Sequence, residues 1–222
     1  MIDLCFYCRW IYKGGSALRT RTGVWLCGFI LLLALSGCGW FDNVSETSAE
    51  NGEDLQEYGL DLHDFSYTNQ SSEVVTNEDL EGEYSLVNMI FTRCPTVCNL
   101  MTPNMSQLQK DLATEDIDAN LVSFTVDPEY DSPEVLKEYG DHYEADYSNW
   151  DFLTGYSLDE VEEFAESTFH SVVAPAADDE DIVHSTDIFL VDENSQVIQR
   201  YDGLEVDTAP ILEDLRRLQG SE

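Results

Sequence analysis

Two cysteines, Cys94 and Cys98, lie four residues apart in the stretch Phe91–Cys98, where an apolar run gives way to a helical pattern. Residues four apart on a helix have Cβ atoms about 5–6 Å apart, whereas a disulfide needs roughly 3.5–4.5 Å between Cβ atoms. Two thiolates in this arrangement can hold one metal ion, and a modest local bend lets them close into a disulfide. The spacing leaves three chemistries open: metal binding, thiol–disulfide exchange and a structural bridge.

The residues around the pair favour a reactive thiol or a copper site over a structural bridge or a closed zinc site. Pro95 suits the first position of a helix, which predicts that Cys94 lies at the helix N-terminus, where the positive dipole end lowers a thiol pKa. A structural bridge explains little, because stabilisation by a disulfide grows with loop length and this loop is very short. Two thiolates are too few for a closed zinc site with four ligands, but two thiolates with one imidazole suit copper.

The third ligand has four candidates: His63, His142, His170 and His184. An isolated histidine is more often a surface or partly buried residue than a ligand, and we interpret the first three in this way. His184 comes immediately before the predicted strand Thr186–Val191, at a strand mouth where loops converge in α/β folds. Met101 and Met105 share a helical face with Cys98. Thioether ligation of Cu(I) is one interpretation of these methionines, and core packing is the more common role of such a stripe.

Six cysteines in the chain reduce to one pair after predicted processing. Two arginines precede the uncharged apolar run Val24–Leu35, which is followed by Ser36-Gly37-Cys38. This is the pattern of a secretory signal, and the run is too short to cross a bilayer comfortably, since spanning takes about 20 apolar residues. Leu35–Cys38 resembles the bacterial lipobox, in which Cys38 would be lipidated and become the mature N-terminus. An uncleaved anchor is the alternative.

The predicted chain therefore has three parts. Residues 1–37 form a lipoprotein signal peptide, residues 38–57 a flexible acidic tether, and residues 58–222 one domain on the extracytoplasmic face of the cell membrane. Cleavage would remove Cys5, Cys8 and Cys27, and lipidation would consume Cys38. The pair Cys94 and Cys98 is then left alone in the predicted mature domain.

The charge of the chain argues against nucleic acid as a partner. It has 45 acidic and 10 basic residues, a net charge of −35, and nearly all of the imbalance lies beyond residue 37. Such a surface repels nucleic acid and other polyanions. The acidic residues are spread through predicted helices and loops, which favours a heavily solvated, halophilic surface over an acidic substrate-binding patch.

The elements that must position the cysteines follow an alternating pattern. The apolar runs Tyr84–Ile90 and Asn120–Val126 predict two buried parallel strands, joined by a crossover helix that runs from the cysteines to about Thr114. Capping signals predict helices after Ser132, Ser157 and Asp207 or Thr208. Further strands are predicted over Leu62–Thr68, Glu73–Thr76, Asn149–Thr154, Thr186–Val191 and Val197–Tyr201. This order indicates a thioredoxin-like α/β fold with a mixed central sheet flanked by helices.

Several motifs follow one another along the chain: Phe91–Cys98, Val122–Pro128, Asp131–Tyr139, Asn149–Gly155, Val183–Thr186 and Phe189–Asp192. In these motifs the chain resembles the Sco/SenC family of copper chaperones for cytochrome c oxidase, over roughly Leu60–Leu218. Asn99 departs from the family pattern, in which a second proline is common. The resemblance implies that Cys94, Cys98 and His184 bind one copper ion, Cu(I) or Cu(II), and that Asp127 lies near this site. It also implies an inserted β-hairpin in the thioredoxin-like fold.

The resemblance supports two functions. One is a membrane-tethered chaperone that delivers copper to the dinuclear copper centre in the copper-binding subunit of cytochrome c oxidase, with Cys94 as the exposed thiolate and Cys98 less exposed. The alternative is a thiol–disulfide oxidoreductase, whose redox-active pair Cys94 and Cys98 keeps the copper ligands of the oxidase reduced. The two overlap, because copper binding through thiolates requires the reduced pair. A third interpretation is a peroxidase-like enzyme that uses Cys94.

Overall fold

The computed structural model describes residues 52–94, 98–176, 181–204 and 207–220, and it leaves out the side chains of residues 98 and 99. The predicted signal peptide, Cys38, most of the predicted tether and Pro95 lie outside these residues. Among the helices that are described, none is long and apolar enough to cross a membrane.

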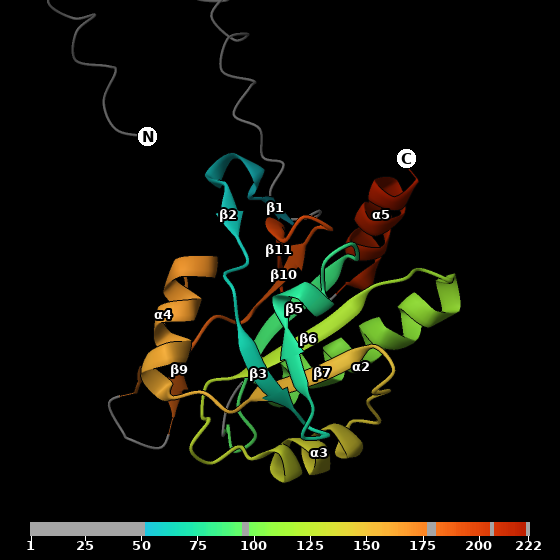
Figure 1. Ribbon diagram of the computed structural model, residues 1–222. Coiled ribbons are helices and arrows are strands. Elements are labelled where there is room, and N and C mark those ends of the chain that lie inside the picture. The colour runs from blue at the N-terminus through green and yellow to red at the C-terminus, as the bar shows by residue number, and fades with distance from the viewer. Residues whose placement is uncertain (1–51, 95–97, 177–180, 205–206, 221–222) are drawn as a thin grey trace, which may run out of the picture. The chain divides into compact units, whose positions relative to one another are not determined.

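A mixed sheet forms the centre of the fold, with the strand order β1-β11-β10-β5-β6-β7-β3-β4 and with β2 also paired to β11 (Figure 1). The strands β5, β6 and β7 are parallel, whereas β10 runs antiparallel to β5 and β3 antiparallel to β7. The strands are β1 (Glu53–Asp54), β2 (Leu60–Asp61), β3 (Ser66–Asn69), β4 (Val74–Thr76), β5 (Ser85–Ile90), β6 (Asn120–Thr125), β7 (Trp150–Thr154), β10 (Asp187–Val191) and β11 (Gln196–Asp202).

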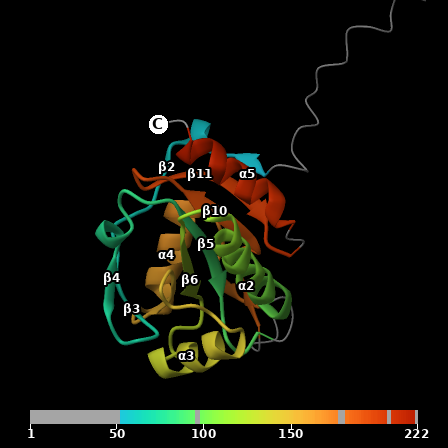
Figure 2. The same cartoon turned by 90° about the vertical axis from the view of Figure 1, so that its right-hand side faces the viewer.

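Four helices cover the two faces of this sheet: α2 (Cys98–Glu115), α3 (Pro133–His142), α4 (Leu158–Phe169) and α5 (Thr208–Gln219). Figure 2 shows α2 and α5 on one side of the central strands and α4 on the other. The alternation of β5 explains why both faces are covered. Val87 and Met89 belong to the core that α4 completes, while Leu86 and Ile90 belong to the core of α2, α3 and α5. The predicted thioredoxin-like architecture is confirmed.

The helix starts follow the predicted capping signals. Ser132 accepts a hydrogen bond from the backbone nitrogen of Val135, Ser157 and Glu160 form a reciprocal capping box, and Asp207 accepts from Ala209. Each cap satisfies a backbone N–H that has no partner within its own helix. Outside the main sheet, β8 (Ala174–Pro175) and β9 (Ile182–Val183) pair as an antiparallel hairpin.

Two boundaries differ from the predictions. The predicted strand Leu62–Thr68 is wrong over its first half: Leu60–Asp61 pairs with β11, whereas Ser66–Asn69 pairs with β7. The intervening Leu62 and Phe65 are buried in the core under α4, which explains their apolar spacing without a strand. The tether prediction also extends too far, because Glu53–Asp54 is β1 and the buried Leu55 donates a backbone hydrogen bond to Ile198.

Candidate functional site

Three segments meet at one edge of the sheet because of the strand directions. The parallel strands β5 and β6 end side by side, with Ile90 opposite Thr125. Since β10 is antiparallel to β5, its first residues lie at the same edge. The cysteine loop after β5 is therefore flanked by Asp127, which follows β6, and by His184, which precedes β10. The convergence of loops at the carboxyl ends of parallel strands is the usual place for a site in an α/β fold.

The cysteine loop, residues 91–94, turns back on itself directly after β5. The backbone nitrogen of Cys94 donates a hydrogen bond to the carbonyl of Phe91, 3.3 Å away. The side chain of Cys94 packs into the core under α4 and is only 8% exposed. The prediction that Cys94 is the exposed thiolate is therefore wrong, since the turn directs this side chain inward. The side chain of Cys98 lies outside the described residues.

His184 lies against this loop. Its ring meets the ring of Phe91 edge to face, with 5.7 Å between centroids, and Nδ1 lies 2.7 Å from the carbonyl oxygen of Ser185. A carbonyl can only accept, so Nδ1 carries the proton in this hydrogen bond. In the neutral ring the lone pair is then on Nε2, which is the atom that an imidazole uses as a metal ligand when the other nitrogen is held in this way.

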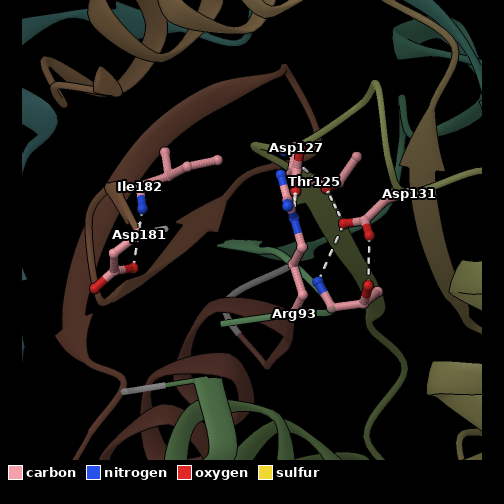
Figure 3. A network of polar contacts seen from close by, with 7 residues as sticks. Arg93, Thr125, Asp127, Asp131, Asp181 and Ile182 are labelled. Atoms are coloured by element: carbon pink, nitrogen blue, oxygen red, sulfur yellow. Dashed lines mark hydrogen bonds and ion pairs between the residues drawn. The ribbon is translucent and has the colours of Figure 1, made fainter. Parts of the chain in front are cut away.

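On the other flank of the loop, Arg93 forms an ion pair with Asp127, with 2.5 Å between Nε and Oδ2 (Figure 3). The arginine side chain is 54% exposed, whereas that of Asp127 is 8% exposed. The guanidinium also lies over the ring of Tyr130, 5.0 Å from its centroid. The hydrogen bond and charge of Asp127 raise the pKa of Arg93 above its ordinary value. The resemblance implies that Asp127 lies near the site, whereas no sequence pattern indicates that Arg93 pairs with it.

A second carboxylate, Asp131, is fully buried behind the loop. It accepts hydrogen bonds from the backbone nitrogen of Thr92 at 3.1 Å, from the Thr92 hydroxyl at 2.5 Å and from the Thr125 hydroxyl at 2.5 Å. Burial raises the pKa of Asp131, and the hydrogen bonds from Thr125 and Thr92 partly offset this rise. The sequence offered one weak signal for this residue, an acid directly before the Ser132 helix cap within a family motif.

The remaining candidates lie in other surroundings. His142 packs against Tyr143 at the end of α3, His170 ends α4 in a left-handed conformation, and the exposed His63 lines a surface hollow with Glu160 and Glu163. Met101 and Met105 are buried, in agreement with core packing. Among the described side chains, no three His, Cys, Asp or Glu residues are clustered closely enough to hold a metal. The predicted set includes Cys98, whose side chain is not among them.

The donor atoms at this edge suit a soft cation. Cys94 supplies a sulfur in apolar surroundings, and His184 supplies an imidazole whose Nδ1 is engaged by the Ser185 carbonyl. Sulfur and imidazole donors are a combination that copper accepts. We therefore consider copper as the cargo of the site.

The fold and this edge of the sheet define a thioredoxin-like protein with a cysteine loop at the end of its central strand. The chain belongs to the SCO1/SenC family, whose model matches residues 55–220. It is 41% identical over 145 residues to a SCO1 protein homolog from Bacillus subtilis (strain 168), covering 65% of this chain and 75% of the relative.

Solved structures agree with this family. A SCO1/SenC family lipoprotein from Bacillus anthracis str. Ames has a TM-score of 0.70 at 35% identity, covering 78% of this chain and 99% of that structure. BsSco has a TM-score of 0.68 at 37% identity, covering 74% of this chain and 96% of that structure. It is a member of the Sco family of cytochrome c oxidase assembly proteins, and a disulfide switch was identified in it. Bradyrhizobium japonicum ScoI with copper bound is a more distant match. Its TM-score is 0.58 at 23% identity, covering 70% of this chain and 97% of that structure, and it shows likeness of fold alone.

Proposed function

We propose that this protein is a membrane-tethered copper chaperone that binds one copper ion through Cys94, Cys98 and His184. It would deliver the metal to the dinuclear copper centre of cytochrome c oxidase during assembly. The observation that carries the proposal is the contact of His184 with Phe91, in a tautomer that has the lone pair on Nε2. The oxidase assembly role of the Sco family, to which the related BsSco belongs, supports the same interpretation.

The burial of Cys94 affects how the metal would leave. Transfer would proceed by ligand exchange, in which a ligand of the partner bonds to copper as one ligand of the chaperone is released. Since Cys94 is only 8% exposed, a partner thiolate does not reach its sulfur without movement of the loop. His184 is half-buried and follows the exposed Val183. We therefore infer that His184 is the first ligand to be released, which differs from the exposed Cys94 expected from the sequence.

Copper titration tests the metal site. In the full chain, purified in detergent and reduced under anaerobic conditions, His184→Ala should weaken Cu(I) binding by at least about tenfold, in line with the loss of one ligand. His63→Ala is the matched control, because His63 is exposed and belongs to a different surface, and its affinity should equal that of the wild type. Competition with a Cu(I) chelator measures both variants. Unchanged affinity in His184→Ala would exclude the three-ligand site.

The second candidate function is thiol–disulfide exchange by the pair Cys94 and Cys98. The disulfide switch in the related BsSco favours it. The same variant separates the two functions, since His184→Ala should leave the exchange rate with a small disulfide nearly unchanged. A rate that falls in parallel with copper affinity would show that the histidine serves both chemistries.

The lipid anchor at Cys38 belongs to the same proposal and is supported by the related lipoprotein from Bacillus anthracis. Replacement of Cys38 by Ser should move the protein from the membrane fraction to the soluble fraction of an expressing bacterium. A variant that stays with the membrane would favour an uncleaved anchor.

A further inference from the structure

Asp131 is fully buried behind the cysteine loop, and neither of the candidate functions uses it. Its carboxylate accepts three hydrogen bonds from neutral donors: the Thr92 backbone nitrogen at 3.1 Å, the Thr92 hydroxyl at 2.5 Å and, as Figure 3 shows, the Thr125 hydroxyl at 2.5 Å. Burial of a carboxylate is unfavourable unless hydrogen bonds compensate for the lost water. Two of these three bonds come from the cysteine loop.

The position of the Asp131 carboxylate is fixed independently of the cysteine loop. Its backbone nitrogen donates to the carbonyl of Asp127 at 2.9 Å, and the next residue, Ser132, caps α3. Thr125, the last residue of β6, holds the carboxylate from another side. Because these links come from β6 and α3, Asp131 stays in place when the cysteine loop moves.

The cysteine loop takes its shape from this fixed acceptor. Thr92 and Arg93 are the central residues of the turn that the 3.3 Å backbone bond from Cys94 to Phe91 closes. The hydroxyl of Thr92 donates to Oδ1 of Asp131, and its backbone nitrogen donates to Oδ2. The turn that these bonds hold directs the side chain of Cys94 into the core under α4, where it is 8% exposed.

A second link between the loop and the β6 flank is weaker. Arg93 pairs with Asp127, but its side chain is 54% exposed, and water screens an ion pair in such a place. The bonds of Thr92 end on a fully buried carboxylate instead, and a hydrogen bond to a charged group contributes more than one between neutral groups. Opening of the turn is therefore limited by Thr92 more than by Arg93.

A buried sulfur is reached from outside only when the segment that covers it opens locally, and the interactions that must break determine how often this happens. We propose that Asp131 is a positioning residue: it holds Thr92, keeps Cys94 turned into the core, and thereby limits how fast an outside thiol or electrophile reaches the sulfur. The inference goes beyond the proposed function, because it concerns access to Cys94 alone and depends neither on copper nor on Cys98.

Alkylation of Cys94 measures this access. The full chain, in detergent and in a Cys98→Ser background, reacts with iodoacetamide: the thiolate displaces iodide, a carbon–sulfur bond forms, and the proton of the thiol goes to the solvent. Mass spectrometry of the peptide that contains Cys94 gives the rate. Thr92→Val keeps the size of the side chain and removes the hydroxyl donor. The rate should rise by at least about tenfold, the size expected for one hydrogen bond to a charged group.

Matched variants separate positioning of the loop from a general loss of stability. Thr125→Val removes a bond of the same length to the same carboxylate, but from β6, and should leave the rate within about twofold of the background protein. Thr92→Ser restores the hydroxyl and should return the rate to the same range. When Asp131 is already alanine, Thr92→Val should change the rate by less than about twofold, because interacting residues are not additive.

Three outcomes would overturn the inference. The first is a rate in Thr92→Val that stays within about twofold of the background protein. The second is an equal rise in Thr125→Val, which would indicate a general loss of stability. The third is a tenfold rise caused by Thr92→Val in the Asp131→Ala protein, which would mean that another group holds Thr92. Each of these leaves the copper titration of His184→Ala unaffected, so failure of this inference is distinguishable from failure of the proposed function.

Discussion

The two flanks of the cysteine loop are built differently. On the β6 flank, a buried carboxylate ties together Thr92 of the loop and Thr125 at the end of β6, and an ion pair joins Arg93 to Asp127. On the β10 flank, the ring of a half-buried histidine lies nearly perpendicular to the ring of Phe91, and the histidine follows the two-residue strand β9. The first flank positions the loop through bonds across the sheet. The second presents a half-buried side chain directly after a short strand.

The largest effect should come from breaking the β6 flank. Asp131→Ala removes the acceptor of three hydrogen bonds, two of which come from side-chain hydroxyls at 2.5 Å. Because the donors lose a charged partner in a buried place, we expect the free energy of unfolding to fall by about 3 kcal/mol. Urea denaturation measures this loss. The exposed Glu163 in the middle of α4 gives a control, since Glu163→Ala should change stability by less than about 0.5 kcal/mol.

An equivalent change on the β10 flank should have a smaller effect on stability. Among the described contacts, His184→Ala removes an edge-to-face ring contact and a hydrogen bond to the adjacent residue, so we expect a loss below about 1 kcal/mol. The same urea titration compares this variant with Asp131→Ala. A loss as large as that of Asp131→Ala would show that the two flanks do not differ in the way described here.

The smallest effect concerns pH. Burial raises the pKa of Asp131, so the folded protein binds more protons than the unfolded chain between the ordinary carboxyl pKa and the raised one. The stability that this group contributes is fully present below the ordinary pKa and is lost as pH rises through the raised pKa. In Asp131→Asn this component is absent. The stability of the wild type relative to the variant should therefore fall as pH rises, measured by urea denaturation at several pH values. A difference that stays constant, or that moves the other way, would argue against a raised pKa at Asp131.

The comparison of flanks also shows where sequence patterns stop being informative. Runs of apolar residues and caps are local, so β5, β6 and the starts of α3, α4 and α5 follow from them. The apolar spacing of Leu62–Thr68 predicts one strand. In the structure this spacing has another cause, because Leu62 and Phe65 are buried under α4 between two short strands with different partners. The end of the tether was misplaced because β1 is only two residues long and is held by pairing with β11.

Sequence patterns alone predict the thioredoxin-like fold, the position of the cysteine pair after a buried strand, and His184 as the histidine nearest to it in the fold. These follow from interactions within a few residues and from motif order. The tertiary structure alone decided that Cys94 is buried, that Arg93 pairs with a residue 34 positions away, and that Asp131 holds Thr92 across 39 positions. Such contacts depend on which strand ends meet at one edge of the sheet, and no local pattern records that.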